Sequence, residues 1–113
     1  QLALHVSGQP FAKAIMAIWD AVREVAPFAY RVLDDISAYV AAAKNLGIPW
    51  EEALDEMVVQ KILPRVKGNN SRIDVVFTSL EDVARQYEFL LTLEKIAYMR
   101  TCYHEHGFTS FFQ

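Results

Sequence analysis

The chain has 113 residues, of which 53% are hydrophobic, and its formal net charge is −3. This length and composition predict one folded domain over residues 1–113 and exclude a disordered chain. The mild charge argues against general binding of nucleic acid or of an anionic membrane by the whole molecule, and no apolar run approaches the roughly 20 residues of a membrane span.

Two amphipathic helices are predicted in the first half of the chain, because apolar residues recur there at steps of three and four. The first helix follows the break before Pro10 and is expected to end near Ala26, since a proline disfavours helical geometry in the residue before it. The second is expected to run from Pro27 to about Asn45, with Gly47 as its C-terminal cap. The predicted inward faces consist of Phe11, Ile15, Ile18, Trp19 and Val22 in the first helix and of Phe28, Val32, Leu33, Ile36, Val40 and Ala43 in the second.

A third helix is predicted to open at Pro49, with Glu51 and Glu52 in its first turn, where the helix dipole favours negative charge. Pro64 must end or kink this helix, because an interior proline removes a hydrogen bond and clashes one turn back. The predicted inward face consists of Leu54, Val58 and Ile62.

The last forty residues allow more than one interpretation. Residues 73–77 have the composition of a short strand, yet apolar residues continue from Ile73 to Leu90 at helical spacing. The capping-like sequence at 79–82 could also start a helix there. We predict helix throughout, then a last helix that Thr92 caps and Gly107 closes. Its inward face is predicted to be Leu93, Ile96, Ala97, Arg100 and Tyr103, with the tail aromatics Phe108, Phe111 and Phe112 folded back over the helices. The predicted fold class is therefore all-α, a small bundle of about five helices.

Several polar sets have the chemistry of metal or catalytic sites but not the spacing. Cys102, His104 and His106 alternate, and side chains two residues apart on a helix point away from each other. The adjacent carboxylates at 34–35 and 51–52 diverge in the same way and are expected to be solvated. No nucleophile elbow, dinucleotide fingerprint or phosphate-binding Gly-Lys loop occurs. We predict no metal ligand and no catalytic residue, so the chain alone is not expected to be an enzyme.

The cysteine content and the N-terminus bear on where the protein works and on its extent. Cys102 is the single cysteine, so no internal disulfide can form, which favours a reducing, cytoplasmic setting. The first residues lack both an initiator Met and the basic start of a signal peptide. We therefore expect the chain to be a C-terminal fragment of a longer protein.

A run of basic residues lies between the third and fourth predicted helices. Its members, Lys61, Arg65, Lys67 and Arg72, fall within twelve residues that contain no acid. One interpretation is a solvated helix end whose cations suit the C-terminal dipole. The other is a patch that contacts DNA phosphates or an acidic neighbouring subunit.

Three segments together resemble the C-terminal helical lid of McrB-like AAA+ ATPases, the motor family of methylcytosine-directed restriction. The first is residues 28–36, FAYRVLDDI, which is similar to the family's aromatic-Gly-Tyr-Arg-Val motif. The second is ALD at 53–55 followed by QKILPRVKG at 60–68, and the third is GFTSFF at 107–112 after Met99. The resemblance spans about residues 10–112, and the chain departs from the motifs with Ala29 for Gly, Asp35 for Glu and Phe112 for Trp.

The resemblance implies a lid that packs on the P-loop core of the same chain, which would bind ATP or GTP with Mg²⁺. Arg31 matches the lid arginine that reaches toward the phosphates, and a guanidinium can bind phosphate oxygens in a bidentate manner. The parent protein would then be an ATPase or GTPase in a homo-oligomeric ring that acts on DNA with a McrC-like nuclease subunit. The alternative for Arg31 is a surface ion pair with Asp34 or Asp35, and the alternative for the whole chain is a helical protein–protein interaction module with no nucleotide role.

Overall fold

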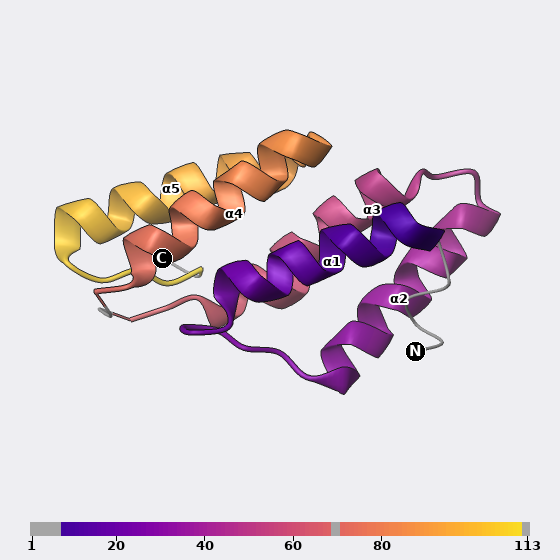
Figure 1. Ribbon diagram of the computed structural model, residues 1–113. Helices are drawn as coiled ribbons and strands as arrows, with labels where there is room; N and C mark the ends of the chain where they lie inside the picture. Colours follow the sequence, from indigo (N-terminus) through magenta and orange to yellow (C-terminus); the bar gives the residue numbers. More distant parts are fainter. Residues whose placement is uncertain (1–7, 69–70, 112–113) are drawn as a thin grey trace.

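Five α-helices form the part of the chain that the computed structural model describes, residues 8–68 and 71–111 (Figure 1). In chain order the helical elements are α1 (Gly8–Val22), α2 (Tyr30–Asn45), α3 (Trp50–Met57), the π-helical turn η2 (Val58–Ile62), the 3₁₀ turn η3 (Leu63–Arg65), α4 (Ile73–Tyr87) and α5 (Leu90–His106). α1 packs against α4, α2 against α3, and α4 against α5, while α3 and η2 also contact α5. The predicted all-α bundle is confirmed, and residues 73–77 belong to a helix.

A single apolar core joins all of these helices. Its largest fully buried side chains include Phe11 from α1, Phe77 from α4 and Phe89 from the link into α5. Burial of one such side chain contributes roughly 1.5–3 kcal/mol, so the helices are stabilised mainly by packing. The faces predicted for the first three helices are buried, with Trp19 and Leu33 only partly so.

The link between α1 and α2 is longer than predicted. α1 ends at Val22, where a turn with a 2.7 Å bond from Ala26 N to Val22 O replaces the last predicted helical turn. α2 begins at Tyr30 and not at Pro27, because Ala29 has extended backbone angles. Phe28, which packs edge-on against Trp19 with ring centroids 5.3 Å apart, anchors this extended link to α1.

Pro64 distorts the third helix before ending it. The Leu63 N–H bonds to the carbonyl of Val58, five residues back, so η2 is one turn of wide helix. An α-helical path would bring the proline ring against the carbonyl of Gln60, and the wider turn followed by η3 avoids that clash. The rod from Trp50 to Arg65 is therefore continuous but changes its hydrogen-bond register.

The turn between α4 and α5 shows that the predictions for Leu90 and Thr92 were wrong. α4 stops at Tyr87, and Glu88 then takes a left-handed conformation with a φ of 60°. Leu90 was predicted to extend the apolar face of α4, but it starts α5 and its side chain is 70% exposed. Thr92 lies inside α5 and does not cap it. The buried side of α5 is Thr92, Ile96, Met99 and Cys102, whereas Ala97 is exposed.

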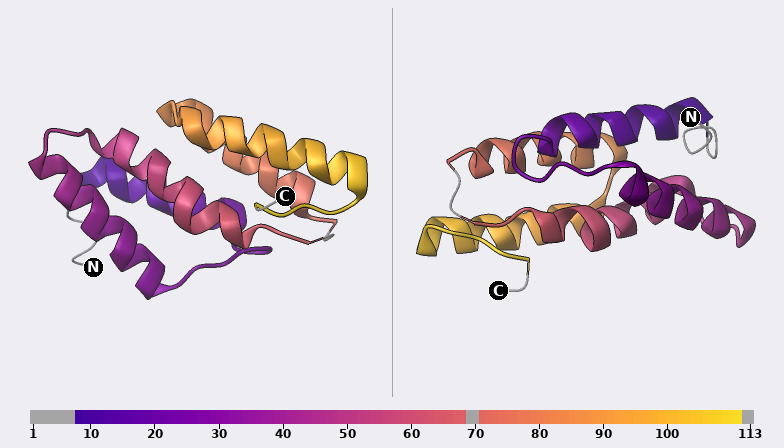
Figure 2. Two further views of the ribbon diagram at one scale, coloured as in Figure 1. Left: turned by 180° about the vertical axis from the view of Figure 1, so that it is seen from behind. Right: turned by 90° about the horizontal axis from the view of Figure 1, so that it is seen from below.

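The tail after α5 returns along the bundle to the segment before α4 (Figure 2). Gly107 ends α5 in the predicted left-handed conformation, and Thr109 then exchanges two backbone hydrogen bonds with Gly68, 2.8 and 2.9 Å long. Phe111 is partly buried on the core as expected, but Phe108 is 47% exposed, because the buried side chain of this turn is Thr109. Phe112 lies outside the described residues.

Candidate functional site

Arg31 lies in the first turn of α2 and its side chain is exposed. The extended residues 27–29 bring the chain into this helix, and no side chain caps its N-terminus in the part of the chain that the structure describes. Unpaired backbone N–H groups and the positive end of the helix dipole therefore accompany the guanidinium. This combination favours a bound anion.

The expected alternative partners of Arg31 do not bond to it. Within residues 8–68 and 71–111, no ion pair or hydrogen bond joins Arg31 to Asp34 or Asp35. Asp35 instead approaches Lys61, with 3.9 Å between Oδ2 and Nζ. The donors of the guanidinium are therefore not taken up by either carboxylate.

An apolar hollow of about 410 Å³ opens between α1 and the start of α2, next to Arg31 in the sequence. We call it the α1–α2 hollow. Two of its side chains, Met16 and Tyr30, are 50% and 69% exposed. Its lining consists of Ile15, Met16, Trp19, Phe28, Ala29, Tyr30 and Leu33.

The basic stretch divides into paired and unpaired cations. Lys61 lies in η2 and pairs with Asp35, while Arg72 precedes α4 and pairs with Glu24 at 3.2 Å. Arg65 and Lys67 are exposed and form no ion pair with any described residue. Surface ion pairs of this kind contribute about 0–1 kcal/mol to stability, so all four cations can still bind a partner molecule.

Asp55 is a buried carboxylate whose role the sequence did not indicate. It comes from α3 and caps the N-terminus of α5, accepting bonds from Leu91 N at 2.9 Å, Thr92 N at 2.8 Å and Thr92 Oγ1 at 2.6 Å. A carboxylate at a helix N-terminus satisfies the orphan N–H groups and the dipole together. The Asp of the Ala-Leu-Asp motif is thus part of the internal structure.

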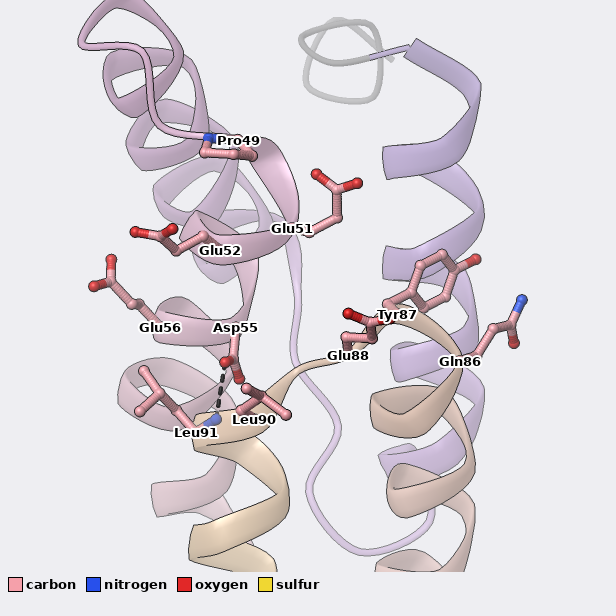
Figure 3. Close-up of a pocket in the computed structure, with 10 residues that line it drawn as sticks. All are labelled: Pro49, Glu51, Glu52, Asp55, Glu56, Gln86, Tyr87, Glu88, Leu90 and Leu91. Atoms are coloured by element: carbon pink, nitrogen blue, oxygen red, sulfur yellow. Dashed lines mark hydrogen bonds between the residues drawn. The ribbon is translucent and has the colours of Figure 1, made fainter.

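A larger groove lies beside this cap, where α3 begins, α4 ends and α5 begins (Figure 3). We call it the acidic groove; its volume is about 770 Å³. α3 supplies carboxylates on one side, the end of α4 forms the other, and the exposed Leu90 and Leu91 lie near the Asp55 cap. The lining residues are Pro49, Glu51, Glu52, Asp55, Glu56, Gln86, Tyr87, Glu88, Leu90 and Leu91.

Two tyrosines have perturbed titration. The pKa of Tyr39 is raised because its hydroxyl donates to the Glu56 carboxylate, and burial and the charges of Glu56 and Glu52 act in the same direction. The pKa of Tyr98 is raised by its hydrogen bond with Cys102, by the electrostatic interaction with that residue and by burial. Both effects favour the neutral phenol.

The cysteine and histidines near the end of α5 have separate surroundings. Cys102 is buried, His104 Nε2 lies 3.0 Å from Asp74 Oδ1, and His106 approaches Glu105 at 3.9 Å. Among the residues that the structure describes, no group of three or more His, Cys, Asp or Glu side chains is placed to hold a metal ion.

Residues 9–108 match the model of a family described as a domain of unknown function, DUF8727. The chain belongs to this family. The match includes Arg31, the α1–α2 hollow, the basic stretch and the acidic groove. No curated protein and no solved structure matches the chain. None of the helices in the described ranges combines the length and the apolar character of a membrane span.

Proposed function

We propose that this DUF8727 chain is the C-terminal lid of a McrB-like AAA+ NTPase and works in the cytoplasm. In this proposal a P-loop core of the same chain holds ATP or GTP with Mg²⁺, and the lid closes over the nucleotide. Neighbouring copies assemble into a ring that acts on DNA with a McrC-like nuclease subunit.

The observation that carries the proposal is the position of Arg31. It lies exposed in the first turn of α2, without an ion pair to another described residue, and directly follows Ala29 and Tyr30, which line the α1–α2 hollow. A planar guanidinium can bind two phosphate oxygens at once, and the helix N-terminus adds favourable electrostatics for an anion. The apolar hollow offers a surface for the core or for the uncharged part of a ligand.

In a lid, an arginine that binds the nucleotide phosphates makes the position of the lid depend on which nucleotide is bound. Arg31 would bind the phosphates when the lid is closed, so loss of the terminal phosphate would weaken the closed state. The basic stretch would then serve subunit or DNA contacts, because its Arg65 and Lys67 are exposed and form no ion pair with a described residue.

The test is hydrolysis by a longer chain that contains the P-loop core. Arg31→Ala should lower kcat strongly while the far-ultraviolet circular dichroism stays unchanged. Arg31→Lys should recover only part of the rate, because the lysine ammonium cannot form the two parallel hydrogen bonds of the planar guanidinium. Arg23→Ala is the matched control, since Arg23 is also an exposed arginine but follows the end of α1 and does not lie at the N-terminus of α2. Unchanged hydrolysis by the Arg31→Ala chain would remove Arg31 from the nucleotide site.

A helical interaction module without a nucleotide role is the second candidate. The apolar lining of the α1–α2 hollow, with the exposed Met16 and Tyr30 in it, favours this candidate, because a contiguous apolar patch at the surface is typical of protein contacts. A Gly-Lys-Ser/Thr phosphate loop in the same gene before residue 1 would support the motor, and a gene that lacks such a loop would support the module.

A further inference from the structure

Opposite charges gather at opposite ends of the rod formed by α3, η2 and η3. Glu51 and Glu52 lie in its first turn and Arg65 is its last residue, about 20 Å away at 1.5 Å per residue. α4 returns from Arg72, the last member of the basic stretch, to Glu88 in the acidic groove. In Figures 1 and 2 the start of α3 and the end of α4 lie toward the side of the bundle that carries the link between α2 and α3, and the segment that precedes α4 lies toward the opposite side.

The acidic groove is suited to a basic segment with aliphatic stems. Its lining contains five carboxylates and, among the described residues, no Lys, Arg or His. Asp55 is saturated by its bonds to α5, but Glu51, Glu52 and Glu88 form no ion pair within the described ranges. Leu90 and Leu91 are 70% and 47% exposed, and the methylene stems of lysine and arginine pack well on such side chains.

The chain itself carries the complementary surface. Arg65 and Lys67 are exposed and without an ion pair to any described residue, and the paired Lys61 and Arg72 flank them. The groove of one copy cannot pair with the same groove of another, because this would bring like charges together at a cost of several kcal/mol. A contact between the groove and the basic stretch brings opposite charges together.

We propose that the acidic groove binds the basic stretch of a second copy of this chain, head to tail. Such a contact is heterologous, so repetition gives a closed ring if the rotation closes and a filament if it does not. The contact rests on the assembly of copies in the proposed function, but not on the nucleotide role of Arg31.

Charge exchange between the two surfaces tests the contact. One variant, Glu52→Lys with Glu88→Lys, reverses the groove, and a second, Arg65→Glu with Lys67→Glu, reverses the basic stretch. Sedimentation velocity of the 113-residue chain at low salt should show concentration-dependent association for the wild type. Each variant alone should associate at least about tenfold more weakly, because each presents only like charges to itself. An equimolar mixture of the two variants should recover association, since each supplies the surface that the other lacks.

Controls separate this contact from a general effect of charge. Asp34→Lys with Glu105→Lys changes the net charge by the same amount at exposed acids outside the groove and should leave association unchanged. Melting curves should show that all variants are folded. A wild type that stays monomeric at every concentration, or a mixture that associates no better than its components, would overturn the proposal. Binding of DNA to the basic stretch with a monomeric wild type would also overturn it, and none of these outcomes depends on hydrolysis.

Discussion

Removal of the Asp55 carboxylate should destabilise the domain more than removal of any surface acid. Asp55 is only 6% exposed and accepts three hydrogen bonds from the first turn of α5. Loss of a helix cap costs about 0.5–2 kcal/mol, and a hydrogen bond to a charged group contributes about 1.5–3 kcal/mol, with strong non-additivity within one network. We therefore expect Asp55→Ala to lower the free energy of unfolding by about 2–4 kcal/mol.

Thermal and urea unfolding measure this loss directly. At about 4–8 °C per kcal/mol, the Tm of Asp55→Ala should fall by roughly 8–32 °C. Asp55→Asn keeps one acceptor oxygen and should lose about half as much. Asp34→Ala, an exposed acid on α2, is the matched control and should stay within about 0.5 kcal/mol of the wild type.

Hydrogen exchange locates the effect. The amides of Leu91 and Thr92 donate to Asp55, so they should lose protection in Asp55→Ala before the core amides of α4 do. A loss of stability below about 0.5 kcal/mol, or unchanged protection of these two amides, would show that the carboxylate does not cap α5 in solution.

Three further outcomes are expected. The raised pKa of Tyr39 means that its bond to Glu56 stabilises the fold below the ordinary tyrosine value of about 10 and is lost as pH rises through the folded value. The stability difference between wild type and Tyr39→Phe should therefore shrink at alkaline pH, and a constant difference would contradict this. Thr109→Val removes the 2.9 Å bond from the buried hydroxyl to Met99 O and should cost about 1 kcal/mol in urea unfolding, whereas an unchanged midpoint would mean that this bond contributes nothing. The chain alone should show no ATP hydrolysis in a phosphate-release assay, because its sequence holds no phosphate loop, and measurable turnover would contradict that view.

Local periodicity predicted the buried faces of the first three helices because each of these helices carries its own apolar stripe. The stripes of α1, α2 and α3 are buried as their spacing indicated, and Gly47 and Gly107 end helices in the left-handed conformation that glycine favours. The wrong predictions fall where contacts between distant parts of the chain determine the local structure. The continuous apolar spacing through Leu90 could not reveal that Glu88 reverses the chain at a positive φ. Threonine often caps helices, but the N-terminus of α5 is capped by the carboxylate of Asp55, 37 positions before Thr92.

The sequence predicted only those parts of the candidate site that a short motif or a local run of charged residues indicates. The sequence singled out Arg31 and the basic stretch, and the structure adds which charges are paired within the described residues. Lys61 meets Asp35, and Arg72 meets Glu24, across 26 and 48 positions of sequence. The acidic groove combines the start of α3 with the α4–α5 reversal, so no single segment of sequence could indicate it.

The two candidate surfaces are built from different helices, which makes their roles separable. The α1–α2 hollow and Arg31 depend on α1 and α2, whereas the acidic groove depends on α3, α4 and the Asp55 cap of α5. Loosening the cap would displace Leu90 and Leu91 from the groove without touching Arg31. A variant at Asp55 that remains folded should thus weaken contact between copies before it affects a ligand at Arg31. The opposite order would mean that the two surfaces are coupled through the α2–α3 packing.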